Sequence, residues 1–162
     1  MKIKTWKLRF SSAIKINKGF TLIEMLVVIS LIGILAALAM VSFSSVQKQA
    51  RDTARKSDLK QYQTATESYA SKNNGAYPLA STAQTAASGT YCNALGIGTC
   101  PADPKNTAPY VYMYITDASV INYVLWTGLE NKSGTWWVVC SNGKNGEYAS
   151  ATAPSTATCP LP

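Results

Sequence analysis

The sequence predicts an α+β fold, in which a long N-terminal α-helix packs on a small antiparallel β-sheet with disulfide-stapled loops. Residues 20–77 contain no proline, and their apolar pattern is that of one long helix. After Pro109 the apolar spacing changes to a period of two, which is typical of strands. All four cysteines follow residue 90, in the part of the chain that holds the sheet. At 162 residues, the chain is long enough for one domain with a modest core.

The first half of the predicted helix, residues 20–41, is a candidate membrane span. Between Lys18 and Lys48 the only charged residue is Glu24. About 20 consecutive, mostly apolar residues are enough to cross a hydrocarbon core of roughly 30 Å. Basic residues precede this segment, and by the positive-inside rule they place the N-terminus in the cytoplasm. The rest of the chain would then lie outside.

The second half of the predicted helix, residues 42–74, is amphipathic. Leu59, Tyr62 and Tyr69 recur at spacings that place them on one helical face. An Asn-Asn-Gly sequence followed by a proline is a helix stop signal. Together the two halves predict one helix from Phe20 to Lys72, whose 53 residues would extend roughly 80 Å at 1.5 Å per residue.

A variable loop, residues 75–108, is expected to separate the helix from the sheet and C-terminal tail, residues 109–162. Residues 110–115 alternate tyrosine with apolar side chains, and further strand-like runs follow at 121–129 and 136–140. Short turns between them predict an antiparallel meander of three strands. Such a sheet needs one covered face, and the apolar face of the helix is the available cover.

The four cysteines allow three disulfide pairings. We expect Cys92 to pair with Cys100, which closes a short loop, and Cys140 to pair with Cys159, which fastens the tail to the last predicted strand. A zinc site is disfavoured because the chain has no histidine and no Cys-x-x-Cys pair. Oxidised cysteines agree with a location outside the cytoplasm.

The charge is concentrated at the N-terminus. The chain has 15 basic and 8 acidic residues, a formal net charge of +7. Six basic residues and no acidic residue lie within residues 1–19, so residues 20–162 carry only +1. The net charge therefore does not indicate a nucleic-acid partner. With no histidine, no recognisable nucleophile turn and no glycine-rich phosphate loop, the sequence does not predict an enzyme.

The most informative stretch begins at Lys18 and reads Lys-Gly-Phe-Thr-Leu-Ile-Glu-Met-Leu-Val-Val-Ile. It resembles the N-terminal signature of the type IV prepilins and of the related pseudopilins of type II secretion and DNA uptake. That signature is a basic leader, a glycine, and then Phe-Thr-Leu-Ile-Glu at the start of an apolar helix. The resemblance runs without a gap to about Ala39, and it implies the type IV pilin fold for the whole chain.

The resemblance implies roles for three residues. A prepilin peptidase would remove the leader, residues 1–19, by cutting between Gly19 and Phe20. Phe20 would then be the new N-terminus and would be N-methylated. Glu24 would pair with the amine of a neighbouring subunit's first residue during assembly.

The resemblance also implies the function and the partners. The chain would be a structural pilin of a type IV pilus or related filament, a helical polymer held together by its N-terminal helices. Small residues would let these helices pack closely in lipid: Ser30, Gly33, Ala36 and Ala37. The partners would be copies of the chain itself, the prepilin peptidase, an inner-membrane assembly platform and minor pilins. The precursor would span the cytoplasmic (inner) membrane once, with its N-terminus inside, before it joins an extracellular filament.

Three other interpretations stay open. The chain could be a major pseudopilin of a type II secretion or DNA-uptake machine. It could be a binding module on an ordinary signal anchor, or carry an ordinary signal peptide cut after the Ala-Leu-Ala sequence at 37–39. Because major pseudopilins bind calcium in loops of this region, Glu130 and Asn131 are a candidate calcium site. We expect no other cofactor.

Overall fold

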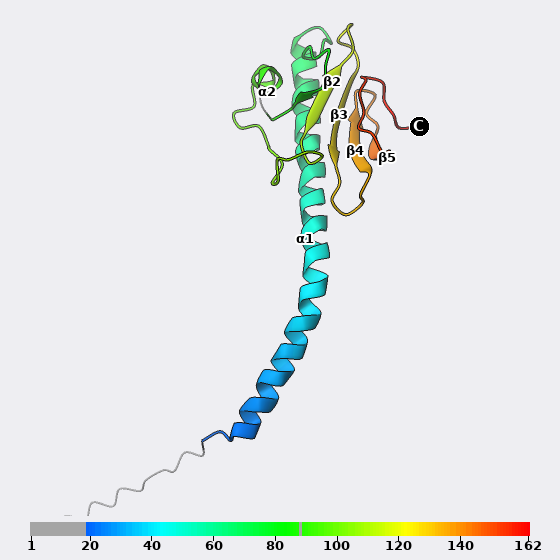
Figure 1. Ribbon diagram of the computed structural model, residues 1–162. Helices are drawn as coiled ribbons and strands as arrows, with labels where there is room; N and C mark the ends of the chain where they lie inside the picture. The colour runs from blue at the N-terminus through cyan, green and yellow to red at the C-terminus, as the bar shows by residue number, and fades with distance from the viewer. Residues whose placement is uncertain (1–18, 88) are drawn as a thin grey trace, which may run out of the picture. The chain divides into compact units, whose positions relative to one another are not determined.

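The computed structural model describes residues 19–87 and 89–162, and Figure 1 shows their elements. The expected basic leader, with all six of its basic residues, lies outside this range apart from Gly19. The structure divides into two units at Met40 and Val41. We call the second unit, Val41–Pro162, the head and describe the two units separately.

One helix, α1 (Leu22–Lys72), runs through both units and has 51 residues. It begins two residues later than the sequence predicts, because Thr21 caps its first turn. Its end is at the predicted stop. There, Gly75 adopts the left-handed conformation (φ 84°) and its N–H donates to the carbonyl of Ala70 at 2.9 Å.

Within residues 19–87 and 89–162, nothing covers the first half of α1. Its large apolar side chains between Leu22 and Leu38 are 44–91% exposed. By length and composition, α1 contains a stretch that can cross a membrane, and none of that stretch is buried. A helix satisfies its own backbone hydrogen bonds, so such a segment is stable in lipid. This is the segment that the sequence identifies as a candidate span.

The head contains a five-stranded antiparallel sheet in which the strands follow one another in chain order. They are β1 (Gln84–Thr85), β2 (Met113–Thr116), β3 (Tyr123–Gly128), β4 (Thr135–Cys140) and β5 (Asn145–Ala149). The predicted three-stranded meander is confirmed as β2, β3 and β4. The two outer strands were not predicted, because β1 has two residues and β5 reads Asn-Gly-Glu-Tyr-Ala, which is poor in strand-forming residues.

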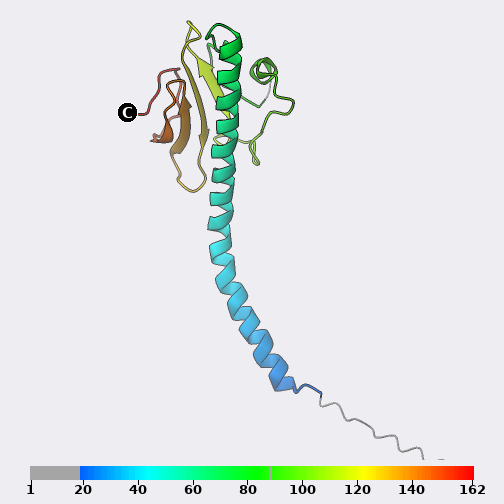
Figure 2. The same ribbon diagram turned by 180° about the vertical axis from the view of Figure 1, so that it is seen from behind.

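The second half of α1 covers one face of this sheet, as Figure 2 shows from behind. Leu59 and Tyr62 are fully buried there, as the amphipathic pattern predicts, whereas Tyr69 is only half-buried. Aromatic rings from the sheet fill the same core: Tyr112, Tyr114 and Tyr123. The core between α1 and the sheet is therefore built largely from tyrosine.

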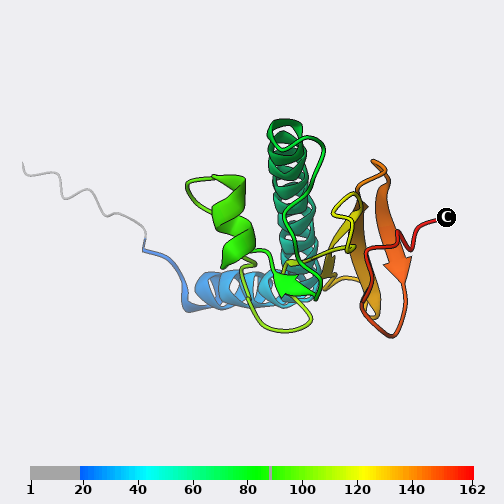
Figure 3. The same cartoon turned by 90° about the horizontal axis from the view of Figure 1, so that it is seen from above.

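The C-terminal tail covers the opposite face of the sheet, as Figure 3 shows from above. It packs on a second apolar cluster made of Ile115, Val124, Trp126, Val138 and Cys140. The disulfide between Cys140 and Cys159 holds the tail against β4, as expected. The tail is thus one layer of the fold, and the sheet lies between it and α1.

The loop before β2 contains a short helix, α2 (Thr90–Leu95), where the sequence predicts only a variable loop. Its one buried side chain is Tyr91, whose ring stacks on Tyr114 with centroids 3.7 Å apart. The expected disulfide between Cys92 and Cys100 closes the loop around α2. The helix has six residues, which is too few for periodicity to show.

A buried ion cluster fastens two loops of the head to α1. Arg55 is fully buried and donates to Asp103 and to Glu130, the latter at 2.7 Å. It also donates to Asp52, one helical turn away, at 2.8 Å. Asp52 in turn accepts the backbone N–H groups of Glu130 and Asn131 at 2.8 and 2.9 Å, which holds the turn between β3 and β4 against the helix.

Glu130 is the most heavily paired carboxylate of this cluster. Besides Arg55, it accepts from Arg51 and from Lys105, each at 2.7 Å. The hydrogen bond from Arg51, together with those from Lys105 and Arg55, holds the pKa of the Glu130 carboxyl well below its usual range. Burial acts in the opposite direction, but the three cations outweigh it.

We predict that Arg55→Met lowers the free energy of unfolding of the head by about 3–5 kcal/mol, because buried carboxylates lose their central cation. Arg51→Met is the matched control. Arg51 pairs with the same Glu130 but is partly exposed, and Glu130 keeps Arg55 and Lys105 without it, so its loss should cost much less. Denaturant unfolding of the full chain in detergent, followed by tryptophan fluorescence, measures both. Equal losses would contradict a central role for Arg55.

We also predict that the head loses stability in acid. The pKa of Glu130 is lower in the folded chain than in the unfolded chain, so its ionised form stabilises the fold at neutral pH. That contribution is complete above the unfolded pKa and is lost as pH falls from about 5 towards 2. Unfolding measured across this range should show a steeper loss in the wild type than in Glu130→Gln. Identical slopes would exclude Glu130 as a source of the acid sensitivity.

Candidate functional site

The expected cleavage site lies just before α1, in backbone that is not helical. Phe20 is 80% exposed, and Gly19 is exposed as well. A Cβ atom added to Gly19 would meet nothing within 4 Å, and its φ lies outside the left-handed region. The described chain therefore gives no steric or conformational reason for a glycine here. A requirement for glycine would have to come from another molecule.

Thr21 and Glu24 form a complete capping box at the start of α1. The backbone N–H of Glu24 donates to Thr21 Oγ1 at 3.2 Å. In return, the backbone N–H and the hydroxyl of Thr21 donate to Glu24 Oε2 at 2.7 and 2.8 Å. The resemblance to prepilins implies a partner for Glu24 only in a neighbouring subunit. The Thr-x-x-Glu spacing before an apolar run is the signal that predicts this second, local role.

The capping box uses one carboxylate oxygen of Glu24. Among the described residues, both donors go to Oε2 and none reaches Oε1. An acid beside an apolar membrane segment is costly unless it is paired, with the cost falling towards the interface. Glu24 therefore has one satisfied oxygen and one that can accept from another molecule without breaking the cap.

The four small residues expected to pack helices lie on the uncovered half of α1, where all are exposed: Ser30, Gly33, Ala36 and Ala37. A Cβ atom on Gly33 would meet nothing within 4 Å. The hydroxyl of Ser30 donates to the carbonyl of Val27 at 2.8 Å, so it needs no partner outside the helix. Spacings of three and four residues bring these positions to one side of the helix, which leaves room for close approach of a second helix.

Glu130 and Asn131, the candidate calcium ligands, lie at the turn between β3 and β4. Both carboxylate oxygens of Glu130 accept from cations of the ion cluster. Within the described ranges, no group of three or more His, Cys, Asp or Glu residues is placed to hold a metal. Calcium binding would require Glu130 to exchange these cations for the ion, and it stays a prediction.

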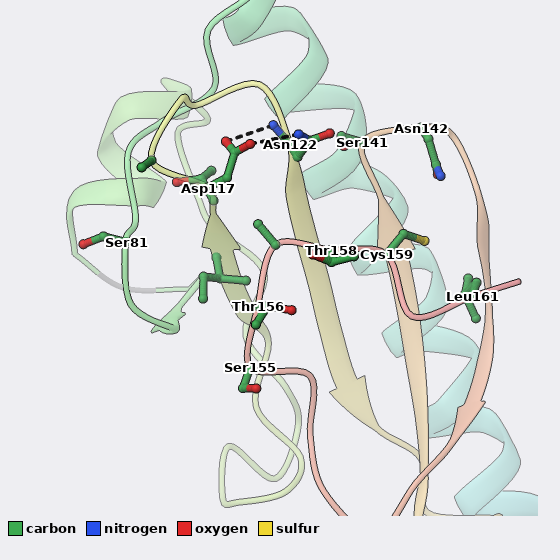
Figure 4. Close-up of a pocket in the computed structure, with 14 residues that line it drawn as sticks. Ser81, Asp117, Asn122, Ser141, Asn142, Ser155, Thr156, Thr158, Cys159 and Leu161 are labelled. Carbon is green, nitrogen blue, oxygen red and sulfur yellow. Dashed lines mark hydrogen bonds between the residues drawn. The ribbon is translucent and has the colours of Figure 1, made fainter.

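A groove with a volume of about 680 Å³ lies at one end of the sheet, between the turns and the C-terminal tail (Figure 4). Eight of its fourteen lining residues are serine, threonine or asparagine, and they include Ser81, Ser155 and Thr156. The carboxylate of Asp117 accepts from Asn122 and from other groups of its own turn. The hydrogen bond from the Asn122 side chain and the further bonds of the turn lower the pKa of Asp117. Asp117 thus serves the turn, and the groove offers hydroxyl and amide groups.

Comparison with known proteins assigns the N-terminal part of the chain. The model of a family described as "Prokaryotic N-terminal methylation motif" matches residues 14–40. The type IV major pilin protein PilA of Myxococcus xanthus (strain DK1622) is 41% identical over 58 residues, 36% of this chain. The match spans about a quarter (26%) of the length of that relative. No solved structure matches the chain significantly.

The motif match includes Gly19, Phe20 and Glu24, which the structure places around the start of α1. The head also fits a type IV pilin, because its small antiparallel sheet with two disulfides packs on the long N-terminal helix. The methylation motif, the likeness to a major pilin and this α+β fold together support a type IV prepilin family for the chain.

Proposed function

We propose that this chain is the structural subunit of a type IV pilus or related filament. In this proposal it is cut after Gly19 and polymerises through the first half of α1. The observation that carries the proposal is the uncovered apolar half of α1, which begins at a glutamate with one open oxygen. A monomer in water would gain nothing from such a segment. A subunit that moves from lipid into a bundle of identical helices needs it.

The precursor stage follows from the charge distribution. The basic residues of the leader hold the N-terminus in the cytoplasm, and the apolar half of α1 spans the inner membrane once. The head, with its two disulfides, then lies on the oxidising side. A prepilin peptidase in the membrane reaches the Gly19–Phe20 peptide near the cytoplasmic face. Its cut removes the leader's positive charges and with them the anchor that fixes topology.

The assembly stage uses the new N-terminus. An α-amino group has an unperturbed pKa of about 7.7–8.0, so it is mostly charged at neutral pH. The open Oε1 of Glu24 is placed to accept from the methylated amine of a neighbouring Phe20 while Oε2 keeps the cap. Such a pair would set the register between adjacent helices. Repetition of one head-to-tail contact gives a helical fibre.

The other partners in the proposal are an inner-membrane assembly platform and minor pilins, together with further copies of the chain. Without the leader, the chain carries a net charge of only +1, so copies can pack closely with little mutual repulsion. The likeness to a major pilin favours a pilus over the alternative, a pseudopilin of a secretion or DNA-uptake machine. Long surface fibres that vanish on deletion of the gene would separate the two.

We predict that Gly19→Val blocks leader removal. A Cβ atom at this position meets nothing in the chain itself, so the block would arise in the peptidase and not from misfolding. Gly19→Ala is the matched control and should still be cut, because it adds only one methyl group. Mass spectrometry of the N-terminus reads the result. A mature Phe20 terminus in Gly19→Val at the wild-type yield would refute this role.

We predict that Glu24→Gln is inserted and cut normally but yields at least tenfold fewer filaments. Glutamine retains the cap, because its amide oxygen can accept from Thr21, but it carries no charge for the amine. Electron microscopy of sheared surface fibres and mass spectrometry of the membrane-bound subunit separate the two stages. Wild-type fibre yield from Glu24→Gln would remove the ion pair from the assembly mechanism.

A further inference from the structure

The capping box at the start of α1 suggests a role for a residue outside the proposed cleavage and assembly set. We propose that Thr21 is a positioning residue for leader removal. Its cap fixes the first residue of the helix at Leu22 and thereby keeps the Gly19–Phe20 peptide outside the helix, where a peptidase can bind it. The inference rests on the proposed cleavage after Gly19.

Three hydrogen bonds set the boundary. Thr21 Oγ1 accepts the N–H of Glu24, and its carbonyl accepts the N–H of Met25 at 3.3 Å, which is the bond that starts the helical ladder. Its own N–H is turned back to Glu24 Oε2. Thr21 therefore has the bonding pattern of an N-cap residue, and the two residues before it carry no helical assignment.

The surroundings make such a boundary necessary. In lipid the backbone must satisfy its hydrogen bonds internally, so an apolar segment gains by extending its helix in both directions. A peptide bond inside a helix has its carbonyl engaged and its backbone coiled, so a hydrolytic site cannot reach it. Gly19 resists helix formation because glycine is a poor helix former. The side chain of Thr21, two residues after Gly19, adds a specific N-terminal boundary to the helix.

The cap and the proposed assembly contact use different oxygen atoms of Glu24. Oε2 of Glu24 serves the cap, and Oε1 stays open for a partner's amine. Thr21→Val removes the hydroxyl but keeps the shape and leaves the charge of Glu24. Thr21→Ser keeps the cap, because serine is an equally good N-cap residue. Glu24→Gln keeps the cap and removes the charge.

The test is cleavage of the full-length precursor in detergent by membranes that contain a prepilin peptidase. Mass spectrometry measures the appearance of the Phe20 N-terminus at several precursor concentrations. For Thr21→Val we expect kcat/KM to fall by up to about fivefold, the factor that corresponds to the loss of a typical N-cap of about 1 kcal/mol. The fall should lie mainly in a raised KM, because a smaller fraction of the substrate is in the competent conformation. Thr21→Ser should match the wild type, because serine keeps the cap.

Each result decides the proposal. It is overturned if Thr21→Val is cut like the wild type, or if Thr21→Ser is as slow as Thr21→Val. It is also overturned if Glu24→Gln is equally slow, since the peptidase would then read charge and not the cap. A change in kcat alone would likewise overturn it, because Thr21 would then act by direct contact with the peptidase and not by setting the helix boundary. Wild-type precursor that is never cut after Gly19 would instead refute the proposed function itself.

Discussion

The helix α1 has 51 residues, but in the described structure the sheet and its loops cover only its second half. The rest of the molecule depends on this difference between the length of the helix and the length that is covered. The covered half has a face of Arg55, Leu59, Tyr62 and Thr66, all fully buried against the sheet and its loops. The uncovered half exposes large apolar side chains along its whole described length. A backbone that satisfies its own hydrogen bonds can tolerate this exposure only in lipid or among other helices. The burial pattern along one helix therefore marks a folding unit and, in the proposed function, a separate assembly unit.

The covered half depends on polar groups as much as on apolar area. Arg55 joins Asp103 and Glu130, which lie 48 and 75 residues away in the sequence, to a single point on the helix. Tyrosine hydroxyls at the edge of the core also form hydrogen bonds between α1 and other segments of the head. That of Tyr62 donates to the carbonyl of Pro101 at 2.6 Å, and that of Tyr112 donates to Asp58 at 2.6 Å. The rings fill the core while their hydroxyls fix the loops, so the variable loop is held in place without a large apolar core of its own.

What the sequence could predict follows from the range of each interaction. The end of α1, its buried Leu59 and Tyr62, and strands β2 to β4 follow from periodicity, which is local. The strand β5 does not, because its pairing with β4 decides its conformation and its residues are poor strand formers. The partners of Arg55 outside the helix, Asp103 and Glu130, could not be predicted, since no spacing rule links a helix position to residues in separate loops. The capping box of Thr21 and Glu24 is local and was open to prediction from its spacing alone.

The glycines show how residues that serve the fold differ from residues that serve another molecule. A Cβ atom on Gly128 would lie 3.0 Å from the carbonyl oxygen of Pro109, so the packing of the head itself disfavours a side chain there. Gly19 and Gly33 have open space around them and no left-handed φ, so the fold of the chain requires neither. Glycine inside a helix costs about 1 kcal/mol relative to alanine, and nothing in the described fold offsets that cost at Gly33. In the proposed function, the missing side chain at Gly19 serves the peptidase, and the one at Gly33 serves the close approach of a second helix in lipid.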